Sequence, residues 1–134
     1  MNYWLIKSDP DTYSWQDLVK DGSTSWDGVR NYAARNHLKG MKKGDKVLVY
    51  HSGGESAIVG IATVTKEFYQ DPTTAETAWV SVSLKAVNAL KKQVTLSQVK
   101  SDKQLKNMVL VKIGRLSVMP VTAEEFESIM KMGS

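Results

Sequence analysis

The sequence predicts an α+β domain in which several short helices surround a small, closed sheet. Strand-like stretches recur at residues 2–7, 42–64, 78–87 and 109–114, and the second stretch is long enough for a two-strand hairpin. Shorter stretches with helix start and stop signals lie between them. The 134 residues contain no repeat or linker and are enough for one hydrophobic core, so we expect a single domain over residues 1–134.

The composition is that of an ordinary folded domain, with 42% hydrophobic and 24% charged residues. The chain has no cysteine, which excludes disulfides and thiolate metal sites and makes the cytosol the expected compartment. No apolar run approaches the length of a membrane span or of a signal peptide. The 18 basic and 14 acidic residues give a net charge of +4, which modestly favours an anionic partner.

The first strand, at residues 2–7, is rich in aromatic and β-branched residues, and turn residues follow it. Ser14 is the expected N-cap of a short helix, Asp17 completes its capping box, and Gly22 ends it. Trp15 shares an apolar face with its helical neighbours, so we expect it in the core.

Residues 25–41 form an unusual amphipathic segment. Helix signals cover residues 29–38, with Asp27 as a possible cap and Gly40 as the stop. The polar face has no carboxylate to pair with its cations; its members are Arg30, Asn31, Arg35 and Asn36. Such a face is either simply solvated or suited to phosphate oxygens and base edges.

The hairpin at residues 42–64 is the most clearly signalled element. A glycine-rich turn joins its strands, and Gly60 inside the second strand indicates a bulge or a close approach of the backbone to another segment. The first strand ends in Tyr50, His51 and Ser52 at the rim of the sheet. In one interpretation Tyr50 packs, His51 faces water and Ser52 starts the turn. In the other, these side chains contact a ligand.

The second half of the chain offers fewer functional signals. The hairpin strand continues until Asp71 and Pro72, with Tyr69 and Asp71 on one face. Residues 78–87 alternate cleanly, with Trp79 on the polar side. Helical turns are expected at 95–100 and 102–108, and a strand at 109–114.

The last helix has the strongest start signal, because Thr122 and Glu125 form a capping box. Gly133 is its expected end.

Catalytic and cofactor motifs are absent from the sequence: there is no nucleophile elbow, phosphate loop, dinucleotide fingerprint or zinc-protease motif. His51 and Ser52 are neighbours on a strand and point to opposite faces, so they cannot act as a base and nucleophile pair. No carboxylates converge with either histidine. We therefore expect no metal or cofactor, and a binding protein rather than an enzyme.

Several ordered motifs together resemble the EVE domain family, which belongs to the PUA-like group and is similar to YTH domains. The motifs are YWLIKSDPDTYSW, WDGVRNYAARN, KKGDKVLVYHS with VGIATV, and RLSVMPVTAEEF. They span nearly the whole chain. The resemblance implies a small PUA-like β-barrel surrounded by short helices, and a pocket for one modified base.

For the site, the resemblance implies three sets of residues. Aromatic walls are expected from Trp26, Tyr69 and Trp79. Contacts to the base are expected from Ser8, Asn31, Tyr50, His51, Ser52 and Asp71. Phosphate contacts are expected from Arg30, Arg35, Lys42, Lys43 and Arg115. Arg115 and Ser117 either close the pocket or tie the last helix to the barrel.

The implied function is reading a methylated or oxidised cytosine in DNA after the base has flipped into the aromatic pocket. A reader of modified RNA and an enzyme acting on a modified nucleoside or on RNA remain alternatives, as does a peptide-binding module. We expect a monomer whose partner is nucleic acid and not a membrane.

Overall fold

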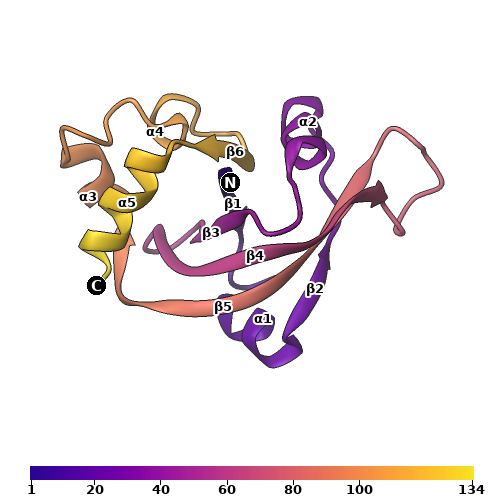
Figure 1. The fold of residues 1–134 in the computed structure, drawn as a ribbon, viewed down its shortest axis with the longest axis horizontal. Helices are drawn as coiled ribbons and strands as arrows, with labels where there is room; N and C mark the ends of the chain where they lie inside the picture. The colour runs from indigo at the N-terminus through magenta and orange to yellow at the C-terminus, as the bar shows by residue number, and fades with distance from the viewer.

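The computed structural model describes residues 1–134 and contains one six-stranded sheet with the strand order β2-β5-β4-β3-β1-β6. β1 and β3 run parallel, and every other neighbouring pair is antiparallel. The strands are β1 (Tyr3–Ser8), β2 (Ser23–Trp26), β3 (Lys46–His51), β4 (Ala57–Gln70), β5 (Val80–Thr95) and β6 (Val118–Val121). Figure 1 shows β4 and β5 as a long curved hairpin that runs across the molecule, with α1 and β2 below it and the other elements above it.

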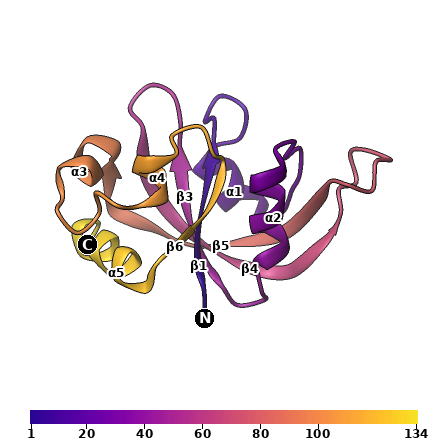
Figure 2. The same ribbon diagram turned by 90° about the horizontal axis from the view of Figure 1, so that it is seen from above.

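Five short helices accompany the sheet, so the predicted α+β class is confirmed. They are α1 (Trp15–Asp21), α2 (Tyr32–Gly40), α3 (Leu96–Ser101), α4 (Val109–Lys112) and α5 (Ala123–Met132). α1 lies beside β2 below the sheet, whereas α2 and the group α3–α5 lie above it (Figures 1 and 2). None of these helices has the length and hydropathy of a transmembrane span.

The sheet is curved but open. β2 and β6 are its two edges, and no strand pairing joins them. The predicted closed barrel is therefore not confirmed. A single cluster of 30 buried hydrophobic residues fills the space between the sheet and its helices.

Three helix starts follow from capping chemistry. The hydroxyls of Ser14 and Thr122 accept from the backbone N–H of Asp17 and Glu125, whose carboxylates accept in return, as predicted. α3 begins with a third capping box, at Thr95. α1 and α5 end at Gly22 and Gly133 as expected.

The start of α2 differs from the prediction. The N-cap is Asn31, whose side-chain oxygen accepts from the Ala34 N–H at 3.0 Å, and not Asp27. Gly28 explains the shift: its φ of +79° breaks helical geometry, and its N–H is taken by Asp71. Residues 27–31 therefore form a non-helical link between β2 and α2.

Two further predictions about local structure were wrong. Residues 109–114 form no strand, because Val109–Lys112 is the short helix α4, which puts Leu110 in the core; a short apolar run does not distinguish the two structures. A turn of helix was also expected at residues 102–108, but residues 103–107 form non-helical turns. β2 was not predicted because its sequence, STSW, has little strand character.

The structure confirms both alternatives predicted for Gly60, a bulge and a close approach of the backbone to another segment. The β4–β5 and β3–β4 registers shift beside it, and a side-chain carbon at this position would lie 2.7 Å from the ring of Trp15. The indole of Trp15 therefore packs directly on the backbone of β4 and holds α1 against the sheet.

We predict that Gly60→Ala destabilises the fold by about 1–3 kcal/mol, because the added methyl group overlaps a buried ring. Urea unfolding measures the change. Gly114→Ala is the matched control, since nothing lies within 4 Å of its new carbon and its φ is not positive. Equal stabilities of the two variants would contradict this packing.

Candidate functional site

The candidate site is a cavity at the end of β1, where the chain turns toward α1 and where β2 and the link to α2 pass by. Its volume is about 530 Å³. The lining comes from four parts of the chain: Lys7, Ser8, Asp9, Thr12, Tyr13, Thr24, Ser25, Trp26, Asp27, Gly28, Val29, Arg30 and Ser117. Three of these residues belong to the predicted site: Ser8, Trp26 and Arg30. Ser117, for which the sequence left two roles open, also lines the cavity.

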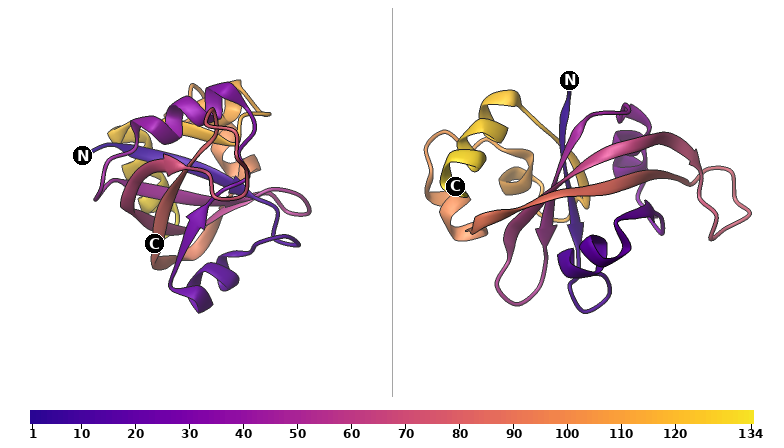
Figure 3. Two further views of the ribbon diagram at one scale, coloured as in Figure 1. Left: turned by 90° about the vertical axis from the view of Figure 1, so that its right-hand side faces the viewer. Right: turned by 60° about the horizontal axis from the view of Figure 1, so that its bottom comes forward.

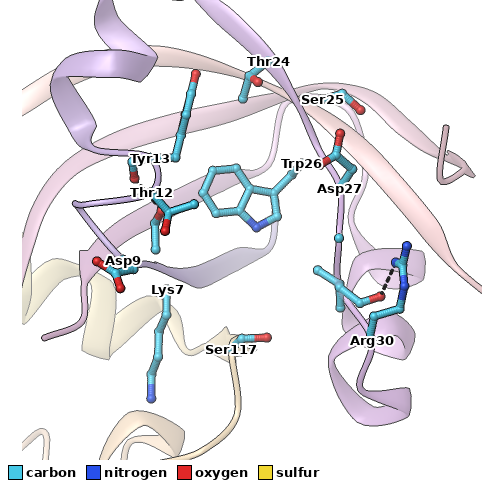
Figure 4. A pocket seen from close by; sticks show the side chains of 13 residues that line it. Lys7, Asp9, Thr12, Tyr13, Thr24, Ser25, Trp26, Asp27, Arg30 and Ser117 are labelled. Atoms are coloured by element: carbon cyan, nitrogen blue, oxygen red, sulfur yellow. Dashed lines mark hydrogen bonds between the residues drawn. The ribbon is translucent and has the colours of Figure 1, made fainter. Parts of the chain in front are cut away.

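Trp26 is the central side chain of the cavity (Figure 4). Tyr13 meets it edge-on, with 6.1 Å between the ring centroids and 74° between the ring planes. The indole N–H groups of Trp4 and Trp79 donate to Asp45 and Glu76, at 2.9 Å each. The indole N–H of Trp26 makes no such bond, so it remains available as a donor inside the cavity.

The walls beside Trp26 are held by hydroxyl groups. The Ser25 hydroxyl lies 2.7 Å from the phenol oxygen of Tyr69, which lies 2.9 Å from the Ser83 hydroxyl. Tyr69 thus connects β2, β4 and β5 behind the cavity instead of lining it. On the opposite side, the Ser8 hydroxyl donates to the Tyr13 carbonyl and fixes the loop that leads to α1.

Asp71 is a fully buried carboxylate that anchors the link between β2 and α2. It accepts from the Gly28 N–H at 2.8 Å, from Arg30 Nη1 at 2.9 Å and from the Thr73 N–H at 2.7 Å and hydroxyl at 2.6 Å. Burial by itself raises the pKa of a carboxyl, but the hydrogen bonds from Thr73, Arg30 and Gly28 outweigh it. The pKa of Asp71 is therefore held well below its usual range, and the group is ionised at neutral pH.

Arg30 is consequently paired, which corrects the expectation that the polar face of α2 has no carboxylate partner. Besides Asp71, it donates to the Val29 carbonyl at 3.0 Å and to the Thr73 hydroxyl at 3.1 Å. Its side chain is still 40% exposed and lines the cavity. These bonds hold the guanidinium in one place, and its other N–H groups remain free for a ligand.

Lys7 is a cavity residue that the sequence analysis did not identify. It is half-buried, and burial lowers the pKa of its amine. Its amine donates to the Gly114 carbonyl at 2.6 Å and lies 5.6 Å from the centre of the Tyr50 ring. Together with Arg30, Lys7 places a second cationic side chain in the cavity lining.

The other lining residues that the sequence analysis did not assign to the site are Asp9, Thr12, Tyr13, Thr24, Ser25, Asp27, Gly28 and Val29. The DPDTYSW motif contains three of them. Their position directly after the first strand was a usable signal, because strand ends are frequent places for binding residues.

Most of the other predicted base contacts have structural roles outside the cavity. His51 Nε2 accepts from the backbone N–H of Trp15 at 2.9 Å, and burial lowers the pKa of this imidazole. Tyr50 is 3% exposed, and the Ser52 backbone N–H donates to the Ser8 carbonyl. Asn31 caps α2, and Trp79 is buried with its indole N–H on Glu76.

The predicted phosphate contacts are dispersed. Lys42 and Lys43 precede β3, so they lie at the opposite end of β3 from His51 and the cavity; the Lys42 amine lies 3.9 Å from Glu67. Arg115 is exposed on the loop whose Ser117 lines the cavity. Arg35 lies on α2 and donates to the Ala78 carbonyl at 3.3 Å.

Comparison with protein families gives a match to the EVE domain over residues 2–132. Human thymocyte nuclear protein 1 is 34% identical over 165 residues, covering 98% of this chain and 73% of that protein. A crystal structure from Agrobacterium tumefaciens superimposes with a TM-score of 0.98 at 41% identity, covering 100% of this chain and 94% of the other.

Two solved complexes have similar folds. Human THYN1 in complex with 5-methylcytosine containing DNA superimposes with a TM-score of 0.93 at 33% identity, covering 100% of this chain and 98% of the other. The YTH domain of Zygosaccharomyces rouxii MRB1, in complex with N6-methyladenosine RNA, gives a TM-score of 0.65 at 13% identity over 99% of this chain and 86% of the other. The second likeness shows a shared fold, as the sequence motifs implied.

Replacement of the buried carboxylate tests the anchor. We predict that Asp71→Asn lowers the free energy of unfolding at pH 7 by about 1.5–3 kcal/mol, the usual cost of losing hydrogen bonds to a charged group. Because the folded pKa lies below the unfolded value of about 3.9, the contribution of Asp71 is complete above about pH 5 and is lost as the pH falls. The difference between parent and variant should therefore shrink from pH 5 to pH 2.

Urea unfolding at a series of pH values measures both effects. Asp11→Asn is the control, because Asp11 is exposed. A difference between parent and Asp71→Asn that does not depend on pH would contradict the assignment of an ionised, buried carboxylate.

Proposed function

The chain belongs to the EVE domain family, and we propose that it is a non-catalytic binding protein that reads a modified base, a methylated or oxidised cytosine in DNA, flipped into the cavity around Trp26. The observation that carries this proposal is the indole of Trp26, whose N–H has no hydrogen-bond partner, in the middle of a polar cavity of about 530 Å³. Ligand pockets commonly have volumes of about 300–1,000 Å³.

The aromatic pair supplies what a flipped base requires. A base that leaves the duplex loses its stacking, and aromatic side chains restore about 1–3 kcal/mol per base. Trp26 offers a flat indole, and the edge-on ring of Tyr13 fixes its orientation. The apolar side chain of Val29 also lines the cavity, where a 5-methyl group can pack.

The polar lining suits the edge of a cytosine. The exocyclic amine of cytosine is a donor, for which a carboxylate is a suitable acceptor. Asp9 and Asp27 both line the cavity and are exposed. The hydroxyls of Thr24 and Ser117, which serve as donor or acceptor, and the indole N–H of Trp26 provide the remaining partners for the base.

Lys7 and Arg30 supply positive charge for the phosphates beside the flipped nucleotide. DNA is preferred over RNA as the target because human THYN1, at 33% identity, was solved with 5-methylcytosine containing DNA. The likeness to the RNA-bound YTH domain, at 13% identity, supports the fold alone.

We predict that Trp26→Ala abolishes the preference for modified over unmodified cytosine and leaves weak, salt-sensitive binding. The loss of stacking should weaken binding of the modified oligonucleotide by about 5- to 150-fold, which corresponds to about 1–3 kcal/mol. Trp26→Phe should retain part of the preference. Fluorescence anisotropy with DNA and RNA oligonucleotides that carry cytosine, 5-methylcytosine or its oxidised forms, at two salt concentrations, measures these quantities.

Phe68→Ala is the matched control, because Phe68 is a 46% exposed aromatic residue on β4 outside the cavity. It should bind and discriminate like the parent. A Trp26→Ala variant that discriminates as well as the parent would falsify the pocket assignment. If the parent prefers a modified RNA to the modified DNA, the target is RNA and the proposal of a DNA target is wrong.

A further inference from the structure

A row of planar side chains leads away from the cavity along α2. The Arg30 guanidinium, in the cavity lining, lies 5.6 Å from the centre of the Trp79 ring. Trp79 packs against Tyr32 with 5.0 Å between the ring centroids and 31° between the planes. The Arg35 guanidinium then lies 4.9 Å from the centre of the Tyr32 ring. We call these four residues the α2 surface.

The two guanidinium groups of the α2 surface are held in place by the protein. Arg30 is fixed by Asp71 and Thr73. Arg35 donates through Nη1 to the Ala78 carbonyl, and through Nε and Nη2 to the side-chain oxygen of Asn36, at 3.2 and 2.9 Å. A guanidinium has five N–H donors, so each group keeps donors for a further partner. Little side-chain entropy is lost when a fixed group binds a phosphate.

Tyr32 offers an accessible aromatic ring on this surface. The residue Trp79, against which it packs, is 8% exposed, whereas Tyr32 itself remains 62% exposed at the start of α2. One face of the Tyr32 ring contacts Trp79, and most of its surface is accessible to a ligand. Exposed aromatic rings between cations are typical of surfaces that bind single-stranded nucleic acid.

The charge of this region favours an anion. α2 contains no acidic residue, and its Arg35 has no carboxylate partner. Two carboxylates lie on the loop that faces it, between β4 and β5, and both are engaged: Asp71 binds Arg30, and Glu76 accepts from the Trp79 indole. Figure 3 shows this loop projecting from the body of the protein beyond α2.

We propose that the α2 surface binds the strand that flanks the flipped base. The guanidinium groups of Arg30 and Arg35 contact phosphates on one side of the flipped nucleotide, and the exposed ring of Tyr32 packs against the sugar or base between them. This inference rests on the proposed function, because the α2 surface continues directly from the cavity through Arg30. It adds a sequence-independent contact, which raises affinity and leaves the choice of base to the cavity.

Oligonucleotides of increasing length test the proposal. Each contains one 5-methylcytosine and is extended by single nucleotides on the 5′ side only or on the 3′ side only. For the parent, the affinity should rise with extension on one side more than on the other. Tyr32→Ala should remove at least about fivefold in affinity from the longer oligonucleotides of that side and leave the shortest one unchanged.

The charge of Arg35 is tested by salt. Arg35→Gln should reduce the slope of log affinity against log salt concentration by about one, whereas Arg35→Lys should largely keep it. Lys39→Gln is the matched control, since Lys39 lies on the same helix but over Phe68, 5.7 Å from its ring centre. Equal slopes for parent and Arg35→Gln, or equal affinities of parent and Tyr32→Ala for every length, would overturn the proposal.

Thermal unfolding of each variant shows whether a loss of affinity is caused by misfolding. Tyr32→Phe, which retains the ring over Trp79, should bind like the parent.

The failure of the base-reader function has a different signature. In that case the parent shows no preference for modified cytosine, while Tyr32→Ala and Arg35→Gln still weaken binding of unmodified strands. A variant that loses the same factor on the shortest and the longest oligonucleotide would place its residue in the cavity and contradict the separate role of α2.

Discussion

The arrangement of the site depends on one buried carboxylate. Asp71 has no exposed surface and remains charged because Arg30, Thr73 and the Gly28 backbone all donate to it. Its neighbours come from the end of β4 and from the link between β2 and α2, which are far apart in sequence. Loss of this anchor would free the segment that carries Arg30 and follows Trp26, and with it one wall of the cavity.

A second constraint acts on the other wall. The Trp15 ring packs on the backbone at Gly60. The backbone N–H of Trp15 donates to the imidazole of His51 at the end of β3. α1 is therefore fixed to β3 and β4, and the loop with Tyr13, which directly precedes α1, is fixed with it. Between these two constraints lies Trp26, which lines the polar cavity and whose indole N–H, unlike those of Trp4 and Trp79, has no hydrogen-bond partner. Preorganisation of this kind limits the entropy lost when a ligand binds.

Much of the fold could be predicted because its signals are local. Capping residues and glycines indicated the ends of α1 and α5. Aromatic and β-branched content predicted β1 and β4, and alternation of side chains predicted β3. The site was harder to predict, because it depends on long-range contacts. The pairing of Arg30 with Asp71, 41 residues away, gives a carboxylate partner to one cation of the face that the sequence showed as unpaired.

His51 and Tyr50 illustrate the same limit. Both belong to a motif shared with the family, yet one holds the backbone of α1 and the other is buried. Family motifs predicted the family and placed Trp26 in the expected pocket, but they do not separate residues that build the fold from residues that line the cavity. Oligomeric state and compartment stay predictions of the sequence.

The central claim is that a modified base enters the cavity against Trp26. The most direct measurement follows the four tryptophan indole N–H resonances by NMR while DNA is added. The account predicts that the Trp26 resonance shifts strongly with 5-methylcytosine DNA and weakly with unmodified DNA, while Trp4, bound to Asp45 in the core, stays in place. A Trp26 resonance that remains unchanged while the modified DNA binds would contradict it.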